Sequence, residues 1–386
     1  MSESPLRVAM IGQKGWPPVH GGIERHVAEL ATRLAARGLQ VDIYSRPHYS
    51  AVHGEVARGI RVRRLPSIPT KHLDAITHST LATLDALARR VDVVHYHALG
   101  PGLLAGLPRW LGRQATVVTV HGLDWQREKW GPIARAVLRC GERACVRQPH
   151  RTIVVSHALQ DHFRQRRGCE TVLIPNGITP PVYRAPRLIR ERGLPERYVL
   201  FVGRLVPEKG CHLLTAAWAR LPEVIRRGVA LVIAGDAGFT DAYVRRLRAE
   251  APPGTRFLGY VHGEILDELY TNAEIVALPS TLEGLSIALL EGMSFGRCCL
   301  VSDIPPNQEA AGGCARLFPS GDVAALGREL AALLADPDGR ARLGAAAQLH
   351  AIEHYSWDRA ADQTAALYRE LAASRAAGAG RKGGRI

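Results

Sequence analysis

The chain has 386 residues, of which 46% are hydrophobic and 22% are charged, as in globular proteins long enough for two domains. None of its apolar runs approaches the ~20 residues that cross a bilayer. Its seven cysteines contain no CxxC pair, and its first residues, MSESPLRVAMIG, lack the features of a signal peptide. We therefore expect a cytoplasmic protein without a disulfide framework.

The positive charge is concentrated in the first half of the chain. Residues 1–185 hold 26 basic and 13 acidic residues, whereas residues 186–386 hold 24 and 23, so almost all of the net +14 lies in the N-terminal half. Such a charge fits either solvated arginine faces or attraction to an anionic partner, such as a phospholipid surface or a lipid diphosphate. Nucleic acid is not expected, because no recognition motif accompanies the charge.

The first half alternates short apolar runs with helical patterns, which predicts an α/β domain. The pair Gly21–Gly22 precedes a helical pattern, and glycines there allow backbone N–H groups to approach a phosphate. A Rossmann dehydrogenase is not favoured, because no GxGxxG is present. Strands are predicted at residues 6–11, 39–45, 61–65, 91–97, 116–120, 152–156 and 172–174, and helices at 23–37, 73–89 and 127–147.

Two histidines at a strand end suggest a possible ligand site. His95 and His97 flank Tyr96 and therefore point to the same side of their strand. Metal ligation needs a third ligand, which the sequence does not locate, so we expect no metal site.

The second half repeats the alternation after a proline-rich linker that contains Pro180, Pro181 and Pro186. The alternation indicates a second parallel sheet with helices on both faces. Strands are predicted at residues 198–202, 229–234, 256–258, 275–278 and 299–302, and helices at 211–221, 264–271, 324–334, 340–354 and 357–373.

Two segments of this half carry the charges of a nucleotide-sugar site. Strand 198–202 meets Gly203 and a loop with Arg204 and Lys209, and two cations on one loop suit a diphosphate. Glu283 and Glu291 follow strand 275–278, and carboxylates accept hydrogen bonds from sugar hydroxyls.

The Arg204/Lys209 loop and the Glu-x7-Glu segment resemble the retaining glycosyltransferases of the GT-B fold, specifically family four, and the resemblance covers nearly the whole chain. It implies an α/β fold of two Rossmann-like, doubly wound parallel-sheet domains facing a cleft. Residues 1–180 would bind the acceptor and residues 181–373 the nucleotide sugar. The resemblance also implies that the last helix, 357–373, crosses back to the first domain. We expect residues 374–386 to be a disordered basic tail.

The resemblance assigns roles to individual residues. His121 would contact the donor sugar near the reacting carbon, and Arg204 and Lys209 would stabilise the diphosphate as charge builds on it. Glu283 would hold donor-sugar hydroxyls and Glu291 the ribose diol. The remaining donor-binding candidates are Gly21, Gly22, Gly203, Gly235, Leu285 and Ser286, and the acceptor-binding candidates, which rest on position, are Asp124, Trp125 and His97.

No metal or cofactor is expected. Asp336–Pro337–Asp338 spells the DxD metal signature of the other major glycosyltransferase fold, but Asp-Pro is typical of a turn, so we interpret it as structural. Arg204 and Lys209 would replace a metal at the diphosphate.

Residues 67–78 and 95–101 resemble stretches of bacterial envelope-polysaccharide members of the family. This resemblance favours a lipid-linked saccharide as the acceptor. It also favours a location at the inner face of the cytoplasmic membrane. Two alternatives stay open, a GT-B-like nucleotide-sugar epimerase and a non-catalytic nucleotide-sugar-binding subunit. A two-carboxylate hydrolase is less favoured, because Glu283 and Glu291 lie near phosphate-binding cations.

Overall fold

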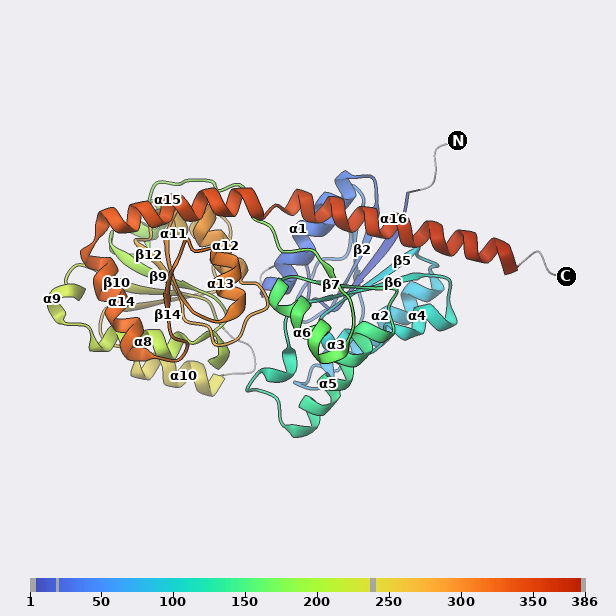
Figure 1. Cartoon of the computed structure of the whole chain (residues 1–386), viewed down its shortest axis with the longest axis horizontal. Helices are drawn as coiled ribbons and strands as arrows, with labels where there is room; N and C mark the ends of the chain where they lie inside the picture. The colour runs from blue at the N-terminus through green and yellow to red at the C-terminus, as the bar shows by residue number, and fades with distance from the viewer. Residues whose placement is uncertain (1–4, 19–20, 237–240, 383–386) are drawn as a thin grey trace. The chain divides into compact units, whose positions relative to one another are not determined.

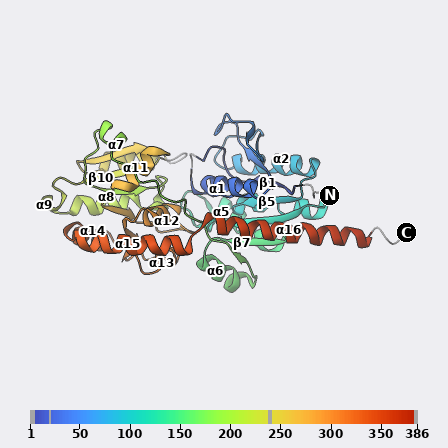
Figure 2. The same cartoon turned by 90° about the horizontal axis from the view of Figure 1, so that it is seen from above.

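The computed structural model describes residues 5–18, 21–236 and 241–382, and it contains two compact α/β units (Figures 1 and 2). The first comprises Met1–Asn176 with Trp357–Ile386, and the second comprises Gly177–Ser356. We predicted a boundary between residues 180 and 181, and the units divide four residues earlier. The difference arises because Ile178 already forms a parallel bridge with Ser356 inside the second unit.

The first unit is built on an eight-stranded sheet in the order β3-β4-β2-β1-β5-β6-β7-β8, in which only the β3–β4 pair is antiparallel. Strand β1 lies between β2 and β5, and its residues Val8, Ala9, Met10 and Ile11 are fully buried. Continuous apolar runs of this kind are typical of parallel strands covered on both faces. The strands are β1 (Arg7–Ile11), β2 (Gln40–Ser45), β3 (Gly54–Ala57), β4 (Ile60–Arg64), β5 (Val93–His97), β6 (Ala115–Val120), β7 (Arg151–Val154) and β8 (Val172–Leu173). The helices are α1 (Gly22–Ala36), α2 (Asp74–Ala88), α3 (Leu99–Gly102), α4 (Gly106–Leu111), η1 (Asp124–Gln126), α5 (Pro132–Arg147), α6 (His157–Arg167) and α16 (Trp357–Lys382).

Helix α16 belongs to the first unit although it ends the chain. It packs against α1, and Arg37 Nε lies 2.7 Å from Asp362 Oδ1 across this contact. We expected the last helix to stop at residue 373 and a disordered tail to follow, but α16 runs to Lys382. Its last residues are mostly Ala, Arg and Lys, which have high helix propensity. Residues 383–386 of the expected tail lie outside the described residues.

The second unit is built on a six-stranded parallel sheet in the order β11-β10-β9-β12-β13-β14. On one side of it, Trp218, Leu214 and Leu326 pack in the core with Phe201. The strands are β9 (Tyr198–Val202), β10 (Ala230–Ala234), β11 (Thr255–Gly259), β12 (Ile275–Leu278), β13 (Cys298–Ser302) and β14 (Arg316–Phe318). The helices are α7 (Leu188–Glu191), η2 (Pro207–Lys209), α8 (Cys211–Arg220), α9 (Glu223–Arg226), α10 (Asp241–Glu250), α11 (Glu264–Asn272), α12 (Ile287–Ser294), α13 (Pro305–Ala311), α14 (Val323–Ala335) and α15 (Pro337–His354).

Two segments near candidate residues differ from the sequence prediction. The basic helix expected at residues 127–147 begins at Pro132, because proline suits the first helical position and Gly131 precedes it in an extended conformation. The Asp336–Pro337–Asp338 motif forms the start of α15, where Asp336 Oδ1 accepts a hydrogen bond from Gly339 N–H at 2.8 Å. Asp336 therefore caps helix α15, which fits the interpretation of the Asp336–Pro337–Asp338 motif as a structural element.

Among the described residues, no helix combines the length and the apolarity needed to cross a bilayer.

Candidate active site

In the second unit, the loop that follows β9 lies against the loop that follows β12. Thr281 N–H donates a hydrogen bond to the Glu208 carbonyl at 2.9 Å. Gly210 adopts φ +68°, and a Cβ at this position would lie 2.0 Å from the Pro279 carbonyl oxygen. Only glycine permits this approach, so the backbone itself holds the two loops together.

Lys209 and Glu283 meet where these loops touch. Lys209 Nζ lies 2.5 Å from Glu283 Oε1, and the two side chains are 21% and 8% exposed. Arg204, at the end of β9, is half-buried on the same loop as Lys209. A partly buried cation held by a carboxylate is a suitable partner for an anionic ligand, because its position is fixed before the ligand arrives.

Glu291 projects from α12 and accepts a hydrogen bond from the Tyr270 hydroxyl at 3.1 Å. We expected the helix to begin near Leu285 and Ser286, with Glu291 two turns inside it. It begins at Ile287, because the Ser286 hydroxyl caps it by accepting from Leu289 N–H at 3.3 Å. Leu285 and Ser286 are therefore buried residues ahead of the helix, and Glu291 lies little more than one turn into it.

Gly203 and Gly235 lie against each other at the ends of β9 and β10. Gly235 has φ +150°, and a Cβ there would lie 1.8 Å from the Gly203 carbonyl oxygen. This contact alone explains why residue 235 is glycine. A role for either glycine in donor binding stays a prediction.

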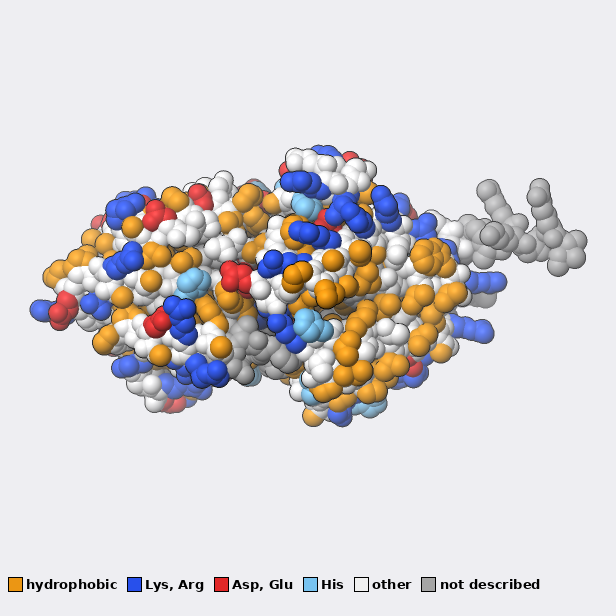
Figure 3. All heavy atoms as spheres, turned by 90° about the horizontal axis from the view of Figure 1, so that it is seen from below, with side chains coloured by type: hydrophobic (Ala, Val, Ile, Leu, Met, Phe, Trp, Pro, Cys, Tyr) orange, Lys and Arg blue, Asp and Glu red, His pale blue; other side chains and the backbone are white. Residues whose placement is uncertain are grey.

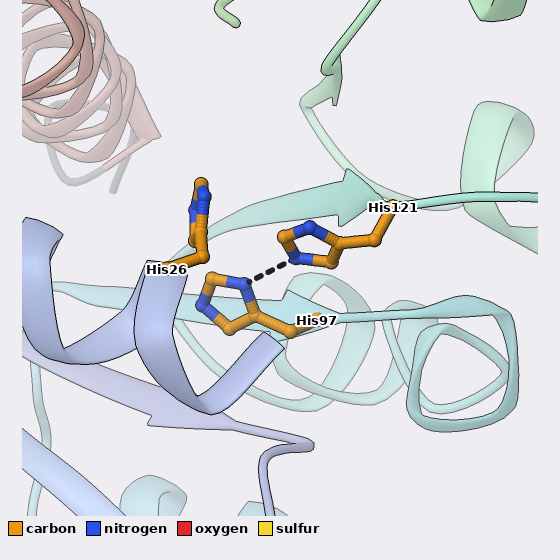
Figure 4. Close-up of side chains that lie close together, drawn as sticks. All are labelled: His26, His97 and His121. Atoms are coloured by element: carbon orange, nitrogen blue, oxygen red, sulfur yellow. Dashed lines mark hydrogen bonds between the residues drawn. The ribbon is translucent and has the colours of Figure 1, made fainter. Parts of the chain in front are cut away.

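In the first unit, three histidines from different elements converge (Figure 4). His97 ends β5, His121 follows β6, and His26 lies in α1. His97 Nδ1 is 3.2 Å from His121 Nε2, and the ring centres of His26 and His121 are 4.6 Å apart. We call His26, His97 and His121 the histidine cluster. It lies at the carboxyl ends of adjacent parallel strands, where α/β folds bind ligands.

The histidine cluster is uncharged at neutral pH. Burial lowers the pKa of His26 from 6.5 to about 4, although its hydrogen bond to Asn176 opposes the shift. Burial and the neighbouring imidazoles also hold the pKa values of His97 and His121 well below the ordinary value. The three rings therefore offer lone pairs and neutral N–H donors rather than positive charge.

The acceptor candidates make contacts that the sequence did not predict. Asp124 Oδ1 forms an ion pair with Arg127 at 2.9 Å. Trp125 Nε1 donates a hydrogen bond to Glu142 Oε2 at 2.6 Å. The Arg139 guanidinium carbon lies over the Trp125 ring, 4.7 Å from the ring centre. We expected the indole face to pack on a sugar, but Arg139 already occupies one of its faces.

His97 and the glycine pair complete the candidates of the first unit. His97 is fully buried, and its Nδ1 lies 3.2 Å from His121 Nε2. A contact between His97 and the acceptor stays a prediction. Gly21 precedes α1 and Gly22 is its first residue. Two residues after Gly22, the Glu24 carboxylate accepts a hydrogen bond from Lys14 N–H at 3.0 Å. A role for the glycine pair in donor binding stays a prediction.

Sequence reasoning missed three residues at these sites: His26, Tyr270 and Glu142. Each lies on a helix and contacts a predicted residue of another segment: His26 contacts His121, Tyr270 donates to Glu291, and Glu142 accepts from Trp125. The sequence offered one signal for His26, which is its place one turn into the helix that follows the glycine pair.

Comparisons with known proteins agree with this architecture. Residues 20–180 match the family described as Glycosyltransferase Family 4, and residues 187–350 match the family described as Glycosyl transferases group 1. The glycogen synthase of Mycobacterium tuberculosis is 30% identical over 96% of this chain and 95% of its own. A D-inositol 3-phosphate glycosyltransferase of Xylanimonas cellulosilytica is 30% identical over 92% and 93%.

Solved structures show the same fold at lower identity. Sucrose-phosphate synthase from Thermosynechococcus elongatus has a TM-score of 0.82 and 23% identity, covering 96% of this chain and all of its own. Anabaena HepE in complex with UDP-glucose has a TM-score of 0.78 and 20% identity, covering 95% and 100%.

These neighbours have the GT-B fold, and the sequence resemblance is confirmed. The chain belongs to glycosyltransferase family 4 and is a glycosyltransferase of the GT-B fold.

Proposed function

We propose that this glycosyltransferase moves a sugar from a nucleoside-diphosphate sugar to a hydroxyl of a lipid-linked saccharide, with retention of the anomeric configuration. The observation that carries the donor side is the Lys209–Glu283 pair on the two joined loops. Relatives of the same fold bind UDP or UDP-glucose in their structures, which supports a nucleotide-sugar donor.

In this proposal the residues of the second unit bind the donor. Arg204 and Lys209 neutralise the diphosphate. These two fixed cations stabilise the negative charge that builds on the leaving diphosphate, and no metal is needed there. Glu283 accepts hydrogen bonds from donor-sugar hydroxyls, and it also keeps Lys209 in place. Glu291, oriented by Tyr270, accepts from the ribose diol.

The transfer step needs no protein nucleophile. The acceptor oxygen attacks the anomeric carbon from the face that the diphosphate leaves, the bond from that carbon to the phosphate oxygen breaks, and a phosphate oxygen takes the acceptor proton. Neutral His121 contacts the donor sugar near the reacting carbon, where a neutral N–H or lone pair avoids repelling the developing positive charge.

The surface of α5 supports an acceptor that is held in a membrane. Ile133 is 83% exposed and Val137 is 49% exposed, one turn apart, and the same helix also carries the exposed Arg139 and Arg143. Figure 3 shows hydrophobic side chains lying among Lys and Arg side chains on one face of the molecule. Apolar residues flanked by cations are typical of helices that bind anionic lipid surfaces.

The test is release of free nucleoside diphosphate from the purified protein, with and without candidate acceptors. Release that requires an acceptor supports transfer, whereas turnover of the donor without any acceptor would favour an epimerase or a hydrolase. The anomeric configuration of the product, read by NMR, tests retention. An inverted product would overturn that part of the proposal.

A further inference from the structure

His97 and His121 share a hydrogen bond between their rings. His97 Nδ1 lies 3.2 Å from His121 Nε2, and the two ring planes differ by 25°. Both side chains are uncharged at neutral pH, because burial holds their pKa values well below the ordinary value. A neutral imidazole carries one N–H and one lone pair, so only one of the two facing nitrogens bears the shared proton.

The second ring nitrogen of His97 decides which ring donates. His97 is fully buried, and its Nε2 has no hydrogen-bond partner among the described residues. If Nε2 carried the proton, a buried N–H group would be left without an acceptor, and orphaned donors are rarer in proteins than unused acceptors. The favoured arrangement therefore places the proton of His97 on Nδ1, which donates it to His121 Nε2.

Accepting at Nε2 fixes the tautomer of His121. Its single proton must then lie on Nδ1. Figure 4 shows that this second nitrogen of His121 points away from His97, and the His121 side chain is partly exposed. His121 therefore presents an N–H donor, rather than a lone pair, to a ligand.

The neighbours of His97 hold its ring in this orientation. His95 lies two residues earlier on the same side of β5, and its ring centre is 4.2 Å from that of His97. His95 is itself fixed, because its Nδ1 lies 2.5 Å from the Tyr368 hydroxyl and its Nε2 lies 2.7 Å from Thr119 Oγ1. The His26 ring packs edge-on at 5.4 Å from the His97 ring. These contacts orient His97 before a ligand arrives.

We propose that His97 is a positioning residue that holds His121 in the Nδ1–H tautomer, so that His121 donates a hydrogen bond to an oxygen of the donor sugar. His97 affects transfer in this way only if His121 contacts the sugar, so the role rests on the proposed function. A fixed and uncharged N–H group binds a sugar oxygen without placing a full positive charge beside the reacting carbon. The role does not require His97 to touch the acceptor.

The tautomer is read from the ¹⁵N chemical shifts of the histidine rings in the full-length protein without donor. The His121 signal is the one that disappears in His121→Gln, and the ring proton on Cδ2 couples more strongly to Nε2 than to Nδ1, which identifies each nitrogen. In the wild type we expect a protonated Nδ1 and an unprotonated Nε2.

The matched variant is His97→Phe, which keeps a ring but removes the hydrogen-bond donor. The His121 proton should then move wholly or partly to Nε2, the position that a free histidine side chain favours. His78→Phe, at another fully buried histidine of the first unit, is the control and should leave the His121 tautomer unchanged.

The kinetics separate positioning from a general loss of structure. His97→Phe should lower kcat/KM for the donor by about 10-fold, as expected for loss of one hydrogen bond. His97→Asn, whose amide N–H can replace Nδ1–H, should recover part of that loss. When His121 is already changed to Phe, adding His97→Phe should lower kcat/KM no further, because the two residues act as one unit.

A proton on His121 Nε2 in the wild type, or on Nδ1 in both the wild type and His97→Phe, would overturn the proposal. A tautomer that switches in His97→Phe while kcat/KM stays the same would instead contradict the role of His121 at the sugar. If the protein turns over no donor at all, the proposed function fails, and the tautomer measurement still decides whether His97 sets the protonation of His121.

Discussion

Lys209 Nζ lies 2.5 Å from Glu283 Oε1, although the two residues are 74 positions apart in the sequence. The contact joins the loop after β9 to the loop after β12, and the Gly210 approach to Pro279 brings the loops together. Because both side chains are largely shielded, salt and solvent screen their attraction less than that of an exposed ion pair. It therefore fixes the ammonium group before a donor binds.

Glu291→Gln should raise the KM for the donor by about 10-fold or more, because a hydrogen bond to a charged group contributes about 1.5–3 kcal/mol. The hydrogen bonds that Glu291 would lose come from the ribose diol. The comparison that checks this assignment therefore uses a matched donor that lacks the 2′-hydroxyl. The wild type should lose affinity for the 2′-deoxy donor, and Glu291→Gln should lose little more on that donor. Equal losses on both donors would place Glu291 away from the ribose. Tyr270→Phe removes only the orienting hydroxyl and should have a smaller effect.

Glu142→Gln should destabilise the first unit by about 2 kcal/mol. Glu142 is buried and accepts hydrogen bonds from Trp125, His162 and Arg167. Burial alone would raise the pKa of Glu142, but the bonds from His162 and Arg167 outweigh it and lower the pKa to about 2. Denaturant unfolding measures the change. Glu170→Gln, at a side chain 78% exposed, is the control and should change stability by less than about 0.5 kcal/mol.

The stability of the protein should fall as the pH is lowered from about 6.5 to about 4, and His78 is one cause. Burial, assisted by the charge of Arg46, lowers the pKa of His78 from 6.5 to about 4. Between these values the unfolded chain takes up a proton that the folded chain does not, so the free energy of unfolding decreases with decreasing pH. The contribution of His78 at about pH 5 is about 2 kcal/mol. His78→Leu should therefore show a shallower loss of stability between about pH 7 and about pH 5 than the wild type, and an identical slope would contradict the assignment.

Ile133→Asp and Val137→Asp should weaken binding to vesicles that contain anionic phospholipid, because both apolar side chains lie exposed on α5. Co-sedimentation measures the bound fraction. Leu349→Asp is the matched control, since Leu349 is an exposed apolar residue of α15 in the second unit. If Leu349→Asp reduces binding as much as Ile133→Asp does, the docking surface is not on α5.

Much of the fold follows from local sequence patterns. Strands β9 and β12 have the bounds that the apolar runs at residues 198–202 and 275–278 predict, since buried parallel strands need uninterrupted apolar residues. The antiparallel edge strand β3 was missed because Gly54–Ala57 is half-exposed and carries no apolar run. The position of the Ser286 cap was also missed, because Leu285 and Ser286 can be read as helical or as preceding a helix.

The candidate site was predictable where charge and spacing identify single residues. Arg204, Lys209, Glu283 and Glu291 stand out because two cations on one loop suit a diphosphate, two carboxylates suit sugar hydroxyls, and their order resembles family four. Their binding roles stay predictions. The partners themselves depend on tertiary packing. Tyr270 reaches Glu291 only because α11 and α12 pack in one unit, and His26 reaches His121 only because α1 covers the strand ends. No local pattern specifies such contacts.

The measurement that tests the account most directly is equilibrium binding of UDP-, GDP- and dTDP-sugars to the wild type and to Lys209→Ala, by calorimetry. One class of donor should bind saturably, and Lys209→Ala should weaken its binding by about 10-fold or more, as expected for loss of a charge-assisted contact. Arg246→Ala, at a side chain 76% exposed on α10, is the control and should bind like the wild type. Saturable donor binding that is unaffected by Lys209→Ala would contradict the assignment of the diphosphate site to the joined loops.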